Sequence, residues 1–166
     1  MGLLATEIAQ PDDELMRQLQ RAYADEWFAH YNYFIAAHLM TGPSSASVAE
    51  LLRGKSSEAL HRADRLAERI IQLGGVPATK LMALVDAATD KPFKLPEDLS
   101  DVGGLLRAVL DAERTSMRTH HGILKTITGR DPITAALVLD LLTEATRGEQ
   151  MLEKLLGDSA PEMMGR

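Results

Sequence analysis

The sequence predicts an all-α fold: a bundle of four long helices in two antiparallel hairpins, joined by one long crossover that carries a short helix. Three observations predict it. Apolar residues recur every three or four positions along four long stretches, as on the buried face of a helix. Aromatic residues are scarce while alanine and leucine are abundant, which favours helices over strands. The first and third connections between these stretches are short and the second is long, which is the pattern of a four-helix bundle with one crossover.

The first hairpin is predicted from its local start and stop signals. The first helix begins at the Pro11–Glu14 segment, whose acidic side chains favour a helix N-terminus, and runs to about Met40. After a Gly-Pro break, Ser44 offers an N-cap for the second helix, which runs to about Leu73. Gly74 and its neighbour provide a left-handed stop.

The second hairpin follows the crossover, which holds a short helical piece near Ala78–Ala88. Ser100 or Asp101 caps the third helix, and Asp131 before a proline is a strong start for the fourth. We therefore expect one bundle domain over residues 12–157. It is flanked by predicted flexible segments at 1–11 and 158–166.

The composition excludes several classes of function. The 166-residue chain has no cysteine, so a metal site must use carboxylates and imidazoles. Its net charge of −6 argues against binding driven by phosphate neutralisation, and we expect no nucleic-acid partner. No apolar stretch approaches the roughly 20 residues needed to cross a bilayer, and the start lacks the pattern of a signal peptide. We expect no membrane association and a cytoplasmic location.

Two glutamates fall on the predicted buried faces, Glu26 on the first helix and Glu113 on the third. Each shares its face with a histidine, His30 and His120 respectively. A buried carboxylate is costly unless it is paired, hydrogen-bonded or bound to metal, so these residues predict a polar site in the bundle. Either histidine is equally well a core imidazole that is hydrogen-bonded to a neighbour.

The second helix carries Glu58 and His61, which spell the metal motif Glu-x-x-His. The helical wheel places Glu58 near the boundary and His61 nearly opposite the core. A solvated pair, in a charged set that includes Arg69, is therefore favoured. A π-bulge near Gly54 would rotate the pair inward. On the fourth helix, Glu144 lies on the shoulder of the apolar face.

Spaced motifs along the chain carry a resemblance to a known family. They are Ala24-Asp25-Glu26-Trp27, Tyr33-Phe34, Ala63-Asp64-Arg65, Glu68-Arg69-Ile70, Leu73-Gly74-Gly75-Val76-Pro77, Leu110-Asp111-Ala112-Glu113 and Gly129-Arg130-Asp131-Pro132. With these motifs the chain resembles the ferritin-like superfamily, in particular its bacterioferritin-like and Dps-like branch, over roughly residues 16–157. The resemblance implies a ferritin-like four-helix bundle and a di-iron centre. That centre takes one Glu from each of two helices and a Glu-x-x-His from each of the others.

The resemblance implies which positions belong to the di-iron centre. In order along the chain they are Glu26, Ala59 with Arg62, Glu113, and Ala145 with Gly148. The two single glutamates are present, but both Glu-x-x-His motifs are replaced. The carboxylates that bridge the two irons would therefore be lost.

Iron handling is the first function that these residues suggest. The resemblance implies iron oxidation or storage, or protection from oxidative stress, here with an altered or impaired ferroxidase centre. Whether the chain is a ferroxidase-type enzyme is left open. The candidate ligands are Glu26, Glu113, His30, His120, Glu58, His61 and Glu144. Iron would bind at reduced occupancy or as a single ion, and no haem is predicted.

The alternative is a metal-free ferritin-fold scaffold. In it, a buried cluster of Glu26, Arg62 and Glu113 replaces the di-iron site, and assembly is the function. For either function the resemblance implies a homo-oligomer, as a dimer or a hollow shell. DNA protection, as in Dps-type relatives, has no support in the charge pattern.

Overall fold

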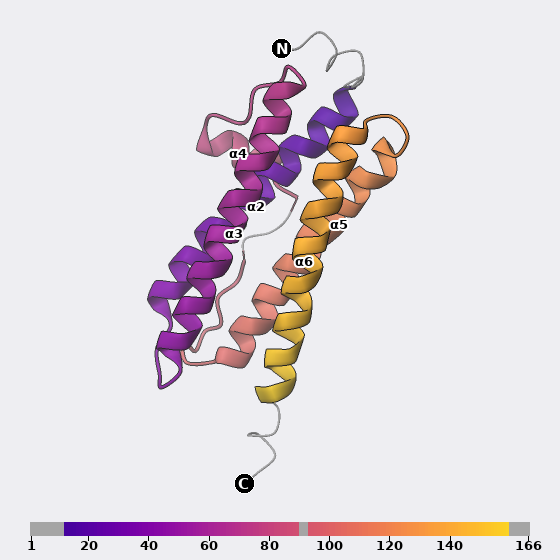
Figure 1. Cartoon of the computed structure of the whole chain (residues 1–166). Helices are drawn as coiled ribbons and strands as arrows, with labels where there is room; N and C mark the ends of the chain where they lie inside the picture. The colour runs from indigo at the N-terminus through magenta and orange to yellow at the C-terminus, as the bar shows by residue number, and fades with distance from the viewer. Residues whose placement is uncertain (1–11, 90–92, 160–166) are drawn as a thin grey trace.

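The computed structural model describes residues 12–89 and 93–159. In this part of the chain, four long helices form a bundle (Figure 1): α2 (Asp13–Leu39), α3 (Ser45–Gln72), α5 (Val102–Ile127) and α6 (Pro132–Ser159). The predicted all-α architecture is confirmed. The predicted flexible segments lie outside the described residues, except that α6 continues two residues past Gly157.

Local hydrogen bonds explain where the helices begin and end. The Asp12 side chain accepts from the backbone N–H of Leu15, and Asp131 accepts from that of Thr134. These bonds satisfy orphan donors of the first turns of α2 and α6. Gly74 and Gly129, which follow α3 and α5, have φ values of 85° and 80°, a backbone conformation that favours glycine.

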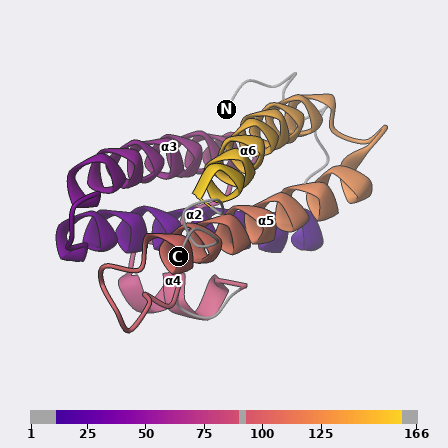
Figure 2. The same ribbon diagram turned by 90° about the horizontal axis from the view of Figure 1, so that it is seen from below.

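The crossover between α3 and α5 runs along the length of the bundle and contains the short helix α4 (Leu81–Ala87). Figure 1 shows that it leaves the end of α3, passes through α4 and returns to the opposite end, where α5 begins. The view from below in Figure 2 places α4 on the side of α2 and α5 that faces away from α3 and α6. The two hairpins are therefore α2 with α3 and α5 with α6, as predicted.

The apolar core is divided into two clusters, one toward each end of the bundle. The cluster toward the start of α2 includes Leu19, Leu66 and Ile123. The other includes Leu52 and Leu105. On every long helix the residues between the two clusters occupy the middle of the bundle, so this middle layer is where a polar site is expected.

Not every large apolar side chain on the long helices is buried. Phe34 is 47% exposed, while its neighbour Tyr33 is buried, because Tyr33 lies on the same helical stripe as Glu26. Ile133 is also exposed, at the first turn of α6. Within the described residues, no helix is apolar over a length that would span a membrane.

Candidate functional site

Two acidic side chains lie in the middle layer, one on α2 and one on α5. Glu26 is buried on the face of α2 that also buries Leu19 and Tyr23, and Glu113 follows Leu110 on the buried face of α5. Each glutamate is 1% exposed. The structure thus places both inside the bundle, where carboxylates need compensating charge or hydrogen bonds.

Arg62 of α3 provides the charge that the two acids share. Its Nε donates to Glu26 Oε2 at 2.8 Å, and its Nη2 lies 3.6 Å from Glu113 Oε1. The guanidinium is 2% exposed. Although burial by itself lowers the pKa of Arg62, the charges of Glu26 and Glu113 outweigh it and raise that pKa. Arg62 is therefore a permanent cation between two buried carboxylates.

The second oxygen of Glu26 is bound from α5. Ser116 Oγ donates to Glu26 Oε1 at 2.6 Å, and His120 Nε2 lies 3.8 Å from the same oxygen. Burial, with the nearby charge of Arg62, lowers the pKa of His120 to about 3. The imidazole is therefore neutral at physiological pH and contributes a polar surface without adding charge.

Glu113 is less well satisfied than Glu26. Tyr33 donates its hydroxyl to Glu113 Oε1 at 3.2 Å, but Oε2 has no hydrogen-bond partner among the described residues. The cation that faces Oε2 is Lys55, whose Nζ lies 4.0 Å away. Burial raises the pKa of Glu113, and the charges of Arg62 and Lys55 offset this only in part.

Sequence reasoning missed Lys55, Tyr33 and Ser116. Lys55 is 2% exposed and donates to Glu58 Oε2 at 2.9 Å. The signal for its burial is present in the sequence, because residue 55 falls between Leu52 and Ala59 at the spacing of the apolar stripe of α3. Because lysine is rarely buried, the apolar spacing alone did not indicate that this residue lies inside the bundle.

The structure does not bring the other predicted ligands into the bundle centre. His30 is half-buried where α2 meets α3, with its Nδ1 2.9 Å from Ser56 Oγ. Glu58 and His61 are exposed, because α3 is a continuous α-helix without the π-bulge that would turn them inward. Glu144 accepts from Arg65 on the flank of α6.

Arg69 also differs from expectation. It was predicted to belong to a solvated face, but it is buried, and its Nη2 donates to Asp131 at 2.8 and 2.9 Å. Its Nε donates to Thr134 Oγ1 at 2.7 Å. This arginine therefore joins the end of α3 to the start of α6.

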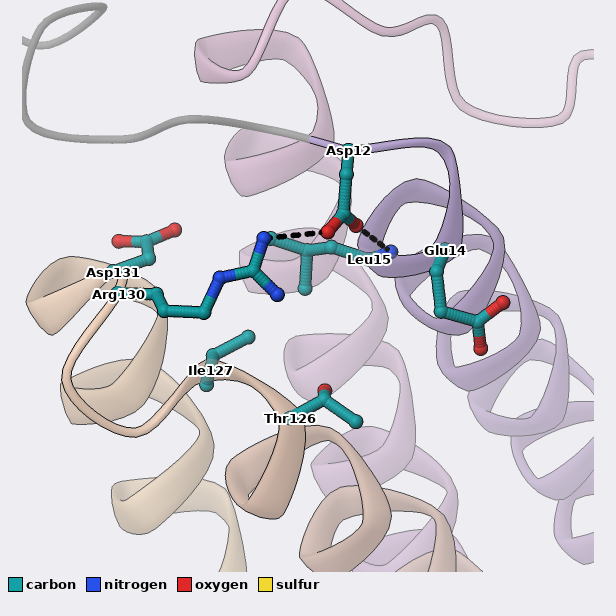
Figure 3. Close-up of a pocket in the computed structure, with 7 residues that line it drawn as sticks. All are labelled: Asp12, Glu14, Leu15, Thr126, Ile127, Arg130 and Asp131. Carbon is teal, nitrogen blue, oxygen red and sulfur yellow. Dashed lines mark hydrogen bonds and ion pairs between the residues drawn. The ribbon is translucent and has the colours of Figure 1, made fainter.

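A surface pocket of about 220 Å³ lies at the end of the bundle, near the start of α2 and the α5–α6 connection (Figure 3). Arg130 donates to Asp12 at 2.6 Å across this pocket, while the second oxygen of Asp12 caps α2. The pocket is lined by residues of the bundle end and includes none of the middle-layer residues. We assign it no role in the site.

Comparison with known proteins identifies the family. The family model of the ferritin-like domain matches residues 16–160. The chain belongs to the ferritin-like family. The earlier resemblance is therefore confirmed.

Individual relatives agree with this assignment. The ferritin-like chain is 28% identical over 144 residues to the "DNA protection during starvation protein" of Pyrococcus furiosus, covering 87% of this chain and 77% of that relative. Among solved structures, the bacterioferritin-related protein of Bacteroides fragilis, described as a dodecameric thioferritin, is 27% identical. It superposes with a TM-score of 0.86, covering 98% of this chain and 96% of that one. Dps from Thermosynechococcus elongatus shares the fold, with a TM-score of 0.80, 21% identity and coverage of 92% and 94%.

The residues of this ferritin-like chain do not fit a di-iron group. The positions at which the resemblance places the two Glu-x-x-His motifs hold Ala59, Arg62, Ala145 and Gly148. In their place the structure puts the cations of Arg62 and Lys55 against the two glutamates. Among the residues described, no group of three or more histidine or acidic side chains is arranged to hold a metal ion.

Proposed function

We propose that this chain is the subunit of a homo-oligomeric ferritin-type shell that serves as a scaffold. Its bundle centre is held by ion pairs of its own and carries out no di-iron oxidation. The observation that supports this proposal is the position of Arg62, 2.8 Å from Glu26 and 3.6 Å from Glu113. A metal ion at the same carboxylates would meet two positive side chains at close range, and this repulsion is strong in a buried site.

Exposed apolar side chains support assembly. On α4, the side chains of Leu81, Met82 and Val85 are all more than half exposed. Several exposed apolar side chains on one short helix are typical of a face that another protein covers. The relative from Bacteroides fragilis is described as dodecameric, which supports a second copy of this chain as the covering protein.

Two measurements on the purified protein test the proposal. Light scattering coupled to size-exclusion chromatography should give the mass of a multi-subunit assembly. Ferrous iron added in air should be oxidised no faster than in protein-free buffer. A monomer in solution would contradict the assembly. Rapid oxidation that is lost in the Glu26→Ala/Glu113→Ala double variant would contradict the claim for the bundle centre.

Iron binding at an altered centre is the second candidate, and it has one observation in its favour. Glu113 Oε2 and His120 Nε2 are buried and have no hydrogen-bond partner among the described residues. A neutral imidazole is a competent metal ligand, so Glu26, Glu113 and His120 are the residues that would hold a single iron. Stoichiometric iron that survives gel filtration would favour this function. The Glu68→Ala variant, at an exposed position on α3, is its matched control, because iron held at the centre is insensitive to that change.

A further inference from the structure

Lys55 is an unusual residue for the inside of a helical bundle. Its ammonium group is almost fully buried, although lysine normally keeps its charged end in water. Its Nζ lies between two acids, 2.9 Å from Glu58 Oε2 at the surface and 4.0 Å from Glu113 Oε2 in the centre. Lys55 therefore connects the buried cluster to an acid whose side chain is 54% exposed.

The two buried glutamates of the middle layer are matched by two buried cations only when Lys55 is counted. Glu26 and Glu113 carry two negative charges, and Arg62 supplies one positive charge. The guanidinium of Arg62 meets Glu26 and the Oε1 atom of Glu113, while Lys55 faces the Oε2 atom of Glu113. An uncompensated charge in a protein interior is strongly unfavourable. A second cation beside Glu113 therefore stabilises its buried carboxylate.

Gly148 on α6 provides the space that the Lys55 amine occupies. A Cβ atom at residue 148 would lie 2.6 Å from Lys55 Nζ and 3.5 Å from Glu113 Oε2. Glycine is less favourable than alanine in a helix interior, and at residue 148 the space that a Cβ atom would fill is taken by the Lys55 amine. Gly122 on α5 is different, because a Cβ there would meet nothing within 4 Å.

We propose that Lys55 is the second internal cation of this bundle. Together with Arg62 it takes the place of a pair of metal ions in balancing Glu26 and Glu113, and Gly148 admits its amine. This proposal deepens the proposed function and rests on it. It predicts that the effect of replacing Lys55 on the melting temperature depends on the charge at residue 113, which tests its role as a counter-ion, and on the side chain at residue 148, which tests where its amine lies.

The coupling with Glu113 is tested by melting temperature at fixed protein concentration. Lys55→Met should lower the melting temperature by roughly 5–15 °C. Adding Glu113→Gln should recover much of this loss, because the amide no longer needs a counter-ion. Lys125→Met, at an exposed position on α5, is the control and should change little. Strictly additive shifts of Lys55→Met and Glu113→Gln would overturn the proposal.

The coupling with Gly148 is tested by alanine substitution. Gly148→Ala should lower the melting temperature of the parent by a small amount, because the flexible end of Lys55 can move away from the new methyl group but then leaves its position beside Glu113. In the Lys55→Ala background the same change should be neutral or stabilising. The matched control is Gly122→Ala, which should be neutral or stabilising in both backgrounds. An equal effect of Gly148→Ala with and without the lysine would refute the steric part of the inference.

A metal readout separates failure of this inference from failure of the proposed function. The melting temperature of the parent should not change with a chelator or with added Co²⁺. A rise with Co²⁺ that is absent from the Glu26→Ala/Glu113→Ala variant would place metal at the centre and overturn both claims. Absence of the two couplings, without any metal response, would overturn the role of Lys55 alone.

Discussion

Replacement of Arg62 by leucine is the most direct test of how the bundle centre is held. The change removes the donor that lies 2.8 Å from Glu26 and the charge 3.6 Å from Glu113, and it leaves both carboxylates buried. Removal of one partner from a buried ion pair costs about 3–5 kcal/mol. For a chain of this size, one kcal/mol corresponds to roughly 2–4 °C in melting temperature. We therefore expect the variant to melt about 6–20 °C below the parent.

The assay is thermal unfolding followed by circular dichroism at one protein concentration, because assembly makes the melting temperature concentration-dependent. Arg53→Leu, at an exposed position on the same helix, is the matched control and should melt close to the parent. The triple variant Glu26→Gln/Arg62→Leu/Glu113→Gln removes all three charges and should recover stability relative to Arg62→Leu. If Arg62→Leu melts within about 2 °C of the parent, the cluster does not stabilise the bundle and the reasoning is wrong.

Four further predictions concern titration, packing and partners. The raised pKa of Glu113 means that its contribution to stability is fully present below the ordinary glutamate pKa of about 4.3 and is lost as the pH rises through the folded-state pKa. Urea unfolding across this range should show that decline in the parent and not in Glu113→Gln. The pKa of His120, lowered from 6.5 to about 3, has the opposite effect: stability present above pH 6.5 falls as the pH drops toward 3, by about 1.4 kcal/mol per pH unit. His120→Phe should lack this slope, and equal slopes in parent and variant would refute the assignment. Arg69→Leu should destabilise by about 3–5 kcal/mol in the same unfolding assay, because Asp131 is left without its partner; an effect no larger than that of Arg53→Leu would contradict this. In a gel-shift assay at low salt the protein should not retard duplex DNA, and retardation that weakens with added salt would contradict this expectation.

Much of the fold is predictable because its signals are local. The caps at Asp12 and Asp131 and the glycine stops at Gly74 and Gly129 depend on residues within one turn, so the sequence locates the helix ends closely. The order of short and long connections then leaves two hairpins and one crossover. The inward positions of Glu26 and Glu113 follow from the same periodicity, while the place of Arg62 beside them follows from the position that the resemblance to the ferritin-like superfamily implies for it.

The burial of charged side chains is less predictable, because it depends on contacts between one helix and another. Lys55 and Arg69 are both on α3, and each is buried because its long side chain extends to a group on another helix. Lys55 reaches toward Glu113 and the space at Gly148, while Arg69 reaches Asp131. A helical wheel records the direction of a side chain but not what stands opposite it.

The sequence by itself determined the four helices and their hairpins, since each depends on residue type and spacing along one chain. Only the tertiary structure decided which side chains lie against the two buried glutamates. The identity of a counter-ion depends on distances of a few ångströms between helices. At those distances a lysine and an arginine face two glutamates, while Glu58 and His61 remain at the surface.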